Sequence, residues 1–277
     1  MAIGTSAEAF SVIQQADSKL VVAGHSYNDY KFDFTLVRYN GNGTLDSSFD
    51  GDGKLITTFG TSAVAHSMIQ QTDGKLVVAG QNYSGSGSKY NFALARYNAD
   101  GSLDSSFDGD GKLTTAIGAG TDCAYAVIQQ TDGKLVVAGE SLNGGNNDFA
   151  LTRYNSDGSL DTSFNGTGKI IIVSASDDRA RSVIQQTDGK LVVAGYGGFG
   201  YQTFVLVRYN ADGTLDNSFD NDGKLTTAIG TSAHEAWSVI QQVDGKLVVA
   251  GHSHNGSNYD LALVRYNIDG SLDTNFN

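Results

Sequence analysis

A unit of about 56 residues occurs five times in this chain, and this repetition limits the fold more than any other feature. The string Ile-Gln-Gln begins at Ile13, Ile69, Ile128, Ile184 and Ile240, at spacings of 56, 59, 56 and 56 residues. Each unit continues with Lys-Leu-Val-Val-Ala-Gly and Arg-Tyr-Asn, and it closes with Leu-Asp-x-x-Phe. Tandem units of this kind indicate an architecture in which each unit packs on its neighbours.

Each unit has the pattern of strands joined by turns. In the second unit, Asp73-Gly74 separates the run ending at Gln70 from the run that begins at Leu76. Asp-Gly between two apolar, β-branched runs is the strongest short-range signal for a hairpin. A third run precedes Arg-Tyr-Asn, and a fourth follows the Leu-Asp-x-x-Phe string. No stretch has a sustained apolar period of about 3.6 residues, so the sequence predicts essentially no helix.

The second run of each unit decides how the units pack. Residues 20–23 (Leu-Val-Val-Ala) are apolar at every position, which predicts a strand covered on both faces. Repeats of about 40–50 residues with four strands each are typical of β-propeller blades. We therefore predict an all-β, five-bladed β-propeller with four antiparallel strands per blade. A single domain, 1–277, would comprise five repeats at approximately 2–59, 60–117, 118–173, 174–229 and 230–277.

The last copy stops at Phe276-Asn277, before the segment that matches the fourth strand. The N-terminal residues are the candidate for closing this last blade. We expect a ring closed within one monomer, and a strand-exchanged oligomer is the alternative.

Composition excludes several classes of partner. The formal net charge is −12 and the pI is near 4.6, whereas nucleic acid and anionic membranes are bound by clusters of Lys and Arg. No apolar run approaches the roughly 18 residues of a membrane span, so no membrane insertion is expected. A single Cys excludes an internal disulfide and a thiolate metal cage.

One segment resembles a known repeat family. The run from Phe92, Phe-Ala-Leu-Ala-Arg-Tyr-Asn-Ala-Asp-Gly-Ser-Leu-Asp-Ser-Ser-Phe, together with Asp-Gly-Lys-Leu-Val-Val-Ala-Gly, is similar to the delta-60 repeat. The resemblance covers all five copies. It implies propeller-type repeats of a large bacterial protein and an extracellular or cell-surface setting, and it carries no catalytic motif and no ligand.

The residues that differ among the copies gather in two connections, expected on one face of the propeller. The connection before the first strand carries, at equivalent positions, Phe10, His66, Tyr125, Arg181 and Trp237. The connection between the second and third strands adds Tyr27, Tyr30, Tyr83, Tyr196, Tyr201, His252, His254 and Tyr259. Rings that stack and groups that donate hydrogen bonds suit a neutral, polyhydroxylated ligand. We predict a multivalent, lectin-like, carbohydrate-binding protein that is not an enzyme.

Two other functions stay open at this point. A purely structural or adhesive module of a larger bacterial surface protein would also explain loops that diverge. A glycosidase would need paired carboxylates, and Glu8 and Glu235 are the candidates, because they occupy equivalent positions in the first and last copies.

Paired carboxylates in the turns raise the question of a metal. The weak candidates for calcium are Asp50, Asp52, Asp108, Asp110, Asp220 and Asp222. They lack the EF-hand spacing, and the third copy has Asn165-Gly166-Thr167-Gly168 in their place. No cofactor is expected, with calcium as the alternative. Arg38 and Asp46, which recur together in every copy, are predicted to form a structural ion pair.

Overall fold

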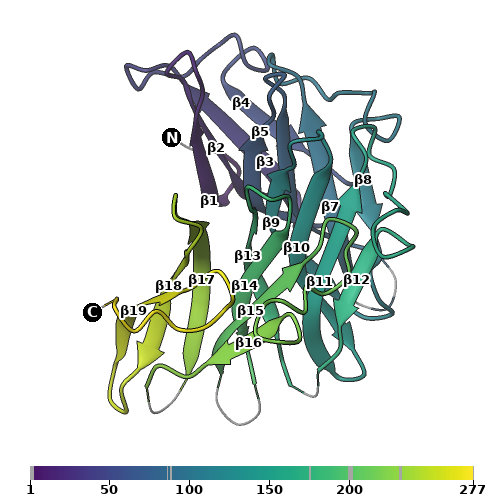
Figure 1. Cartoon of the computed structure of the whole chain (residues 1–277). Coiled ribbons are helices and arrows are strands. Elements are labelled where there is room, and N and C mark those ends of the chain that lie inside the picture. Colours follow the sequence, from purple (N-terminus) through teal and green to yellow (C-terminus); the bar gives the residue numbers. More distant parts are fainter. Residues whose placement is uncertain are drawn as a thin grey trace. The chain divides into compact units, whose positions relative to one another are not determined.

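The computed structural model describes residues 3–85, 87, 89–174, 176–198, 202–230 and 233–276. Over these residues the fold is all-β, with five antiparallel sheets that follow one another along the chain (Figure 1). Within this described part there is no helix, and so none long and apolar enough to cross a membrane. The all-β prediction is confirmed.

Each sheet is a simple meander in which neighbours in sequence are neighbours in the sheet. The first sheet contains β1 (Ser6–Gln14), β2 (Leu20–Asn28), β3 (Lys31–Tyr39) and β4 (Lys54–Thr57). The second contains β5 (Ala63–Gln70), β6 (Leu76–Tyr83), β7 (Tyr90–Tyr97) and β8 (Lys112–Thr115). The third contains β9 (Asp122–Gln129), β10 (Leu135–Asn143), β11 (Asn146–Tyr154) and β12 (Lys169–Ile172). The fourth contains β13 (Arg179–Gln185), β14 (Leu191–Gly197), β15 (Thr203–Tyr209) and β16 (Lys224–Thr227), and the fifth contains β17 (His234–Gln241), β18 (Leu247–His254) and β19 (Tyr259–Tyr266).

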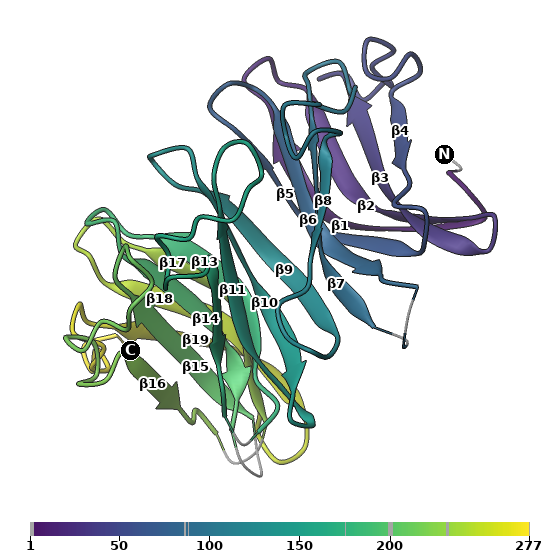
Figure 2. The same cartoon turned by 90° about the vertical axis from the view of Figure 1, so that its right-hand side faces the viewer.

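The chain divides into two compact units. Unit 1 comprises Met1–Val137 and Tyr154–Ser159, and unit 2 comprises Ala138–Arg153 and Leu160–Asn277. The first two sheets belong to unit 1 and the last two to unit 2, while the boundary runs through the third sheet. Figure 2 shows β5–β8 of unit 1, and Figure 1 shows β13–β16 of unit 2. The prediction of one domain closed by its N-terminus stays a prediction.

The second strand of each sheet forms the centre of the core. In β6 and β14 every residue of the Leu-Val-Val-Ala-Gly run is buried, on both faces of the sheet. In unit 1, Leu76 and Val78 pack with Phe34 and Leu36 of the preceding sheet. In β6 and β14 the continuous apolar run is therefore covered on both faces, as the sequence predicts. For residues 20–23 of β2 the prediction is wrong, because Leu20 is 37 % exposed and Val22 is half-buried, so one face of that strand is only partly covered.

A cluster of Arg, Asp and Phe joins the 3–4 connection of each of the first four sheets to the next sheet. Arg38 Nε donates to Asp46 Oδ2 at 2.6 Å, and the Arg38 guanidinium lies 4.6 Å from the centre of the buried Phe49 ring. Arg38 also donates to the carbonyl oxygen of Ala99, which belongs to the turn after β7. Equivalent clusters form around the pairs Arg96–Asp104, Arg153–Asp161 and Arg208–Asp216. Arg265 pairs with Asp273 and contacts Phe276 in the same way, after the last strand. The structural ion pair predicted from the sequence is confirmed.

Candidate functional site

The first strands β1, β5, β13 and β17 contain a β-bulge, and each bulge supplies one variable side chain. The register shifts between Ala9 and Ser11 in β1, and likewise in β5, β13 and β17. The extra residues at these shifts are Phe10, His66, Arg181 and Trp237. The sequence interpretation placed them just before the first strand, whereas they lie inside it, because the strand starts several residues earlier. Bulges commonly redirect a side chain beside a binding or active site.

The glycine that ends Leu-Val-Val-Ala-Gly makes this bulge fit. A Cβ atom on Gly24 would lie 1.9 Å from the carbonyl oxygen of Glu8, and one on Gly80 would lie 2.0 Å from that of Val64. A Cβ atom on Gly195 would lie 1.9 Å from the carbonyl oxygen of Arg179, and one on Gly251 would lie 1.9 Å from that of Glu235. Only a residue without Cβ allows the bulged strand to come so close.

In unit 1 the bulge residues Phe10 and His66 and the equivalent Tyr125 form a row across adjacent first strands. The rings of Phe10 and His66 have centres 5.4 Å apart, and those of His66 and Tyr125 are 5.2 Å apart. His25 of β2 stacks on Phe10 at 5.5 Å. The Phe10 side chain is 50 % exposed, so one end of this row is open to solvent. We call Phe10, His66 and Tyr125 the bulge row of unit 1.

In unit 2 the bulge row consists of Arg181 and Trp237. The Arg181 guanidinium lies 4.7 Å from the Trp237 ring centre, a cation–π distance, and Trp237 Nε1 donates to His252 Nδ1 at 3.2 Å. Trp237 is 48 % exposed. Tyr196 is only 2 % exposed, and its hydroxyl accepts a hydrogen bond from Arg181 at 3.0 Å. Tyr196 therefore positions Arg181 rather than facing solvent.

Other predicted site residues form cross-strand pairs at the 2–3 hairpins. The ring pairs are Tyr27–Phe32 at 5.1 Å, Tyr83–Tyr90 at 5.5 Å and His254–Tyr259 at 4.9 Å. All three occupy opposed positions of the second and third strands. Such pairs stabilise the hairpin ends by themselves.

The variable connections also contain Tyr30, Tyr201 and His25. Tyr30 is almost fully exposed in a turn, with φ of 67°. Tyr201 lies outside the described residues. His25, which the sequence interpretation did not assign to the site, is buried between Phe10 and Phe32. Its place opposite Glu8 in the β1–β2 register is the signal that would have identified it.

The two candidate carboxylates each face a histidine. Glu235 Oε2 lies 4.0 Å from His252 Nε2, and Glu8 is opposite His25. Burial lowers the pKa of His25, and the negative charge of Glu8 acts in the opposite direction. Glu8 belongs to unit 1 and Glu235 to unit 2, so their proximity stays a prediction.

The Asp residues of the acidic turns stabilise the backbone of those turns. Asp50 adopts a left-handed conformation with φ of 50°, as do Asp108, Asp220 and, in the third copy, Asn165. Asp52 Oδ1 accepts a hydrogen bond from the Lys54 amide at 2.8 Å, and Asp110 and Asp222 do the same for the lysines that follow them. The described part of the chain holds no group of three His, Cys, Asp or Glu side chains suited to a metal ion. Calcium binding stays a prediction.

Asp50→Asn is expected to stabilise the protein at neutral pH. Burial, together with the charges of Asp52 and Asp100, raises the pKa of Asp50. The ionised form therefore costs stability above that pKa, and the gain from Asn should disappear as the pH falls below it. Asn165 shows that this left-handed position accepts Asn. Differential scanning calorimetry should show a rise of about 1 °C in Tm at pH 7. Asn165→Asp should lower Tm. A lower Tm for Asp50→Asn would show that the charges of Asp52 and Asp100 do not destabilise the protein through Asp50.

Solved structures of the same fold provide a comparison. A protein of unknown function from Dyadobacter fermentans aligns over 96 % of this chain and 82 % of its own, with a TM-score of 0.63 and 11 % identity. An endo-arabinase from Bacteroides thetaiotaomicron aligns over 95 % of both chains, with a TM-score of 0.47 and 12 % identity. An α-L-arabinanase from Cellvibrio cellulosa aligns over 96 % of this chain and 94 % of its own, with a TM-score of 0.46 and 10 % identity. No protein with a curated description matches this sequence.

These names correct one prediction. The sequence predicts that the chain is not an enzyme, yet proteins named endo-arabinase and α-L-arabinanase are among the structures that align with nearly all of it. The lack of a recognisable catalytic motif was the ground for that prediction, and it does not exclude an enzyme. The prediction is therefore wrong as an exclusion.

A family of propeller repeats matches the sequence at five places, residues 15–49, 71–107, 130–164, 186–219 and 242–276. The matches follow the five sheets, each running from the end of a first strand to the Phe of the 3–4 connection. The propeller-type repeat implied by the delta-60 resemblance is thus confirmed, and the delta-60 name itself stays a prediction. The matched segments cover more than half of the chain, which therefore belongs to the family described as domain of unknown function (DUF5122) beta-propeller.

Proposed function

We propose that the two bulge rows bind a neutral carbohydrate. The observation that carries this proposal is the bulge itself, which repeats the same backbone in sheet after sheet while its side chain changes. A packing requirement would repeat the side chain together with the backbone. Here the bulge glycine is the same each time, and the residue beside it is Phe, His, Arg or Trp.

The chemistry of the rows supports a sugar. Phe10 and Trp237 are each about half exposed, and aromatic residues open to solvent suit the apolar face of a pyranose or furanose ring. His66 and Arg181 lie beside these rings, Arg181 donates a hydrogen bond to Tyr196, and His252 accepts one from Trp237. A few polar groups beside an apolar surface fix the orientation of a ligand. Several weak sites on one chain that bind the same polymer together would raise the overall affinity well above that of a single site.

Trp237→Ala is expected to weaken the binding of a polysaccharide or oligosaccharide at least about tenfold, as the loss of a central aromatic contact does. Trp237 is the single Trp of the chain, so its fluorescence reports the unit 2 row directly. A glycan array would identify the ligand, fluorescence titration would give the affinity of the unaltered protein, and calorimetry would give that of the variant.

The control variant is Val243→Ala, because Val243 is fully exposed on the turn between β17 and β18, away from the row. It should bind like the unaltered protein. Failure to bind any glycan on the array would favour the other function considered, a structural or adhesive module at a bacterial surface. An extracellular setting, which the delta-60 resemblance implies, agrees with both functions.

A further inference from the structure

The exposed indole of the unit 2 bulge row is bonded to a titratable side chain. Trp237 Nε1 donates to His252 Nδ1 at 3.2 Å, across the β17–β18 pair. A ring nitrogen that accepts a hydrogen bond carries no proton, so His252 is neutral in this arrangement and its proton is on Nε2. Nε2 lies 4.0 Å from Glu235 Oε2. The imidazole therefore lies between the indole N–H and a carboxylate.

Protonation of His252 breaks this contact. An imidazolium has an N–H at both nitrogens, so Nδ1 can no longer accept from the indole, and the two N–H groups oppose each other. The His252 side chain is 28 % exposed, so it can take up a proton from solvent in the folded protein. Arg181 already places one cation over the Trp237 ring at 4.7 Å, and a charged His252 adds a second beside it. Trp237 therefore loses its hydrogen bond when His252 becomes charged.

Other titratable groups near His252 come from β17, β18 and β19. On β19, Tyr259 packs against both His252 and His254, at ring distances of 4.7 and 4.9 Å, and Asp260 accepts a hydrogen bond at the end of the hairpin. On β17, His234 is buried, and burial together with the positive charge of His252 lowers its pKa. His234 therefore stays neutral at a pH at which His252 is already charged.

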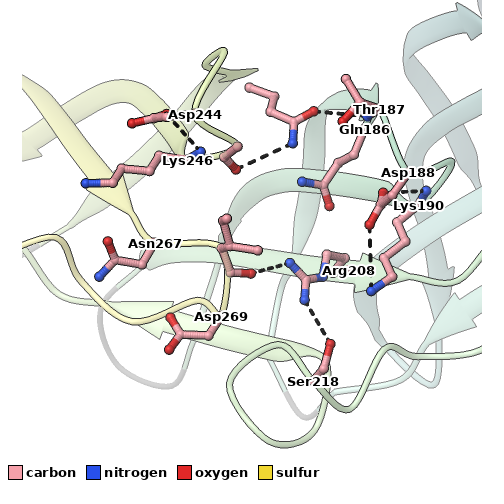
Figure 3. Close-up of a pocket in the computed structure, with 13 residues that line it drawn as sticks. Gln186, Thr187, Asp188, Lys190, Arg208, Ser218, Asp244, Lys246, Asn267 and Asp269 are labelled. Carbon is pink, nitrogen blue, oxygen red and sulfur yellow. Dashed lines mark hydrogen bonds and ion pairs between the residues drawn. The ribbon is translucent and has the colours of Figure 1, made fainter.

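The acidic residues of the turns between first and second strands lie at the other end of these sheets. Asp244 accepts from the Lys246 amide at 3.2 Å in the turn between β17 and β18 (Figure 3). Asp188 accepts from the Lys190 amide at 3.1 Å in the turn between β13 and β14. His252 lies near the opposite end of β18. These carboxylates are therefore separated from the imidazole by most of the length of the strand.

Unit 1 contains the same arrangement of side chains without the hydrogen bond. His25 occupies the position equivalent to His252, opposite Glu8 in the β1–β2 register, and it stacks on Phe10 at 5.5 Å. Phe10 has no N–H, so no bond to the bulge residue depends on the charge of His25. Burial lowers the pKa of His25, and the charge of Glu8 acts in the opposite direction. The unit 1 row is therefore expected to keep its geometry at a pH at which the unit 2 row changes.

We propose that His252 is a positioning residue whose charge regulates the unit 2 bulge row: neutral His252 fixes the Trp237 ring, and protonated His252 releases it. The release is a property of the protein alone, whereas its effect on a sugar rests on the function proposed above. A side chain that must be ordered again on binding costs affinity. Glycan affinity at the unit 2 row should therefore fall about twofold to tenfold between about pH 8 and pH 5, the range in which histidine changes charge.

The test follows the indole N–H signal of ¹⁵N-labelled full-length protein between about pH 8 and pH 5. Trp237 is the one Trp of the chain, so the spectrum contains one such signal. The signal should move through one transition, because a bonded and a released indole N–H differ in chemical shift. His252→Asn should abolish the transition and keep the signal near its position at high pH, since Asn Oδ1 can replace Nδ1 as the acceptor and does not titrate. Glu235→Gln should move the midpoint to lower pH, because it removes the negative charge beside Nε2.

His254→Asn is the matched control, because His254 is on the same strand while the indole N–H is bonded to His252, and it should leave the transition unchanged. An indole signal that does not move, or that moves equally in His252→Asn, would overturn the proposal.

The glycans of the array, titrated by Trp237 fluorescence at both ends of the pH range, test the effect on binding separately. Weaker binding at low pH in the unaltered protein, and not in His252→Asn, would support the regulation. Equal affinity at both pH values, together with a moving indole signal, would overturn it. A moving indole signal with no glycan bound at either pH would instead overturn carbohydrate binding, while the release of Trp237 would stand.

Discussion

Gly80→Ala is expected to destabilise the protein by at least about 3 kcal/mol, the upper range for overpacking a folded interior. The added Cβ would lie 2.0 Å from the carbonyl oxygen of Val64 and 2.8 Å from the Cα of Ala65. Both neighbours are backbone atoms of β5, so no side-chain rotation relieves the clash. The bulge in β5 would have to open, and with it the hydrogen bonds that place His66.

The measurement is thermal unfolding followed by circular dichroism. For a chain of this size, 3 kcal/mol corresponds to a fall in Tm of about 6–12 °C. Gly41→Ala is the matched control, because Gly41 also has an ordinary φ and its added Cβ would meet nothing closer than 3.4 Å. A Gly80→Ala protein as stable as Gly41→Ala would show that the bulge does not need the glycine.

The repeat, the strands and the buried second strand could be predicted because each leaves a local pattern. Asp-Gly between apolar runs identifies a hairpin, and the unbroken run Leu76–Ala79 identifies a strand covered on both faces. The bulge leaves a weaker pattern, because the extra residue stands at the same place in β1, β5, β13 and β17 and so does not change the repeat length. The glycine inside the second strand was its signal, since Gly in a strand often marks a close approach of another backbone.

The candidate site residues, too, could be predicted from the sequence only in part. Equivalent positions such as Phe10 and His66 could be aligned from the sequence, and within unit 1 their rings are indeed neighbours. Exposure could not be predicted, because Tyr196 and Trp237 are both aromatic and variable yet differ from 2 % to 48 % in exposed surface.

Asp104→Asn is expected to lower the free energy of unfolding by about 3–5 kcal/mol at pH 7, as the loss of one partner of a buried ion pair does. Asp104 Oδ2 accepts from Arg96 Nε at 2.7 Å and from Lys75 Nζ at 2.9 Å. The Arg96 side chain is only 5 % exposed and also contacts the Phe107 ring, so its charge would remain buried without a counter-ion. Asp110→Asn is the control, because Asp110 is largely exposed and lies 3.9 Å from its nearest cation.

The pH dependence of this effect separates the ion pair from simple packing. Burial would raise the pKa of Asp104, but hydrogen bonds from Lys75 and Ser106 and the charge of Arg96 outweigh it and hold the pKa well below its usual value. A carboxyl group with a lowered pKa stabilises the fold above the pKa of the unfolded chain, about 3.9, and loses that contribution as the pH falls through its own pKa. Guanidinium unfolding should therefore show the full difference between Asp104→Asn and the unaltered protein at pH 7 and a shrinking difference below about pH 4. A difference that stays constant between pH 7 and pH 2 would mean that the shape of the side chain matters and its charge does not.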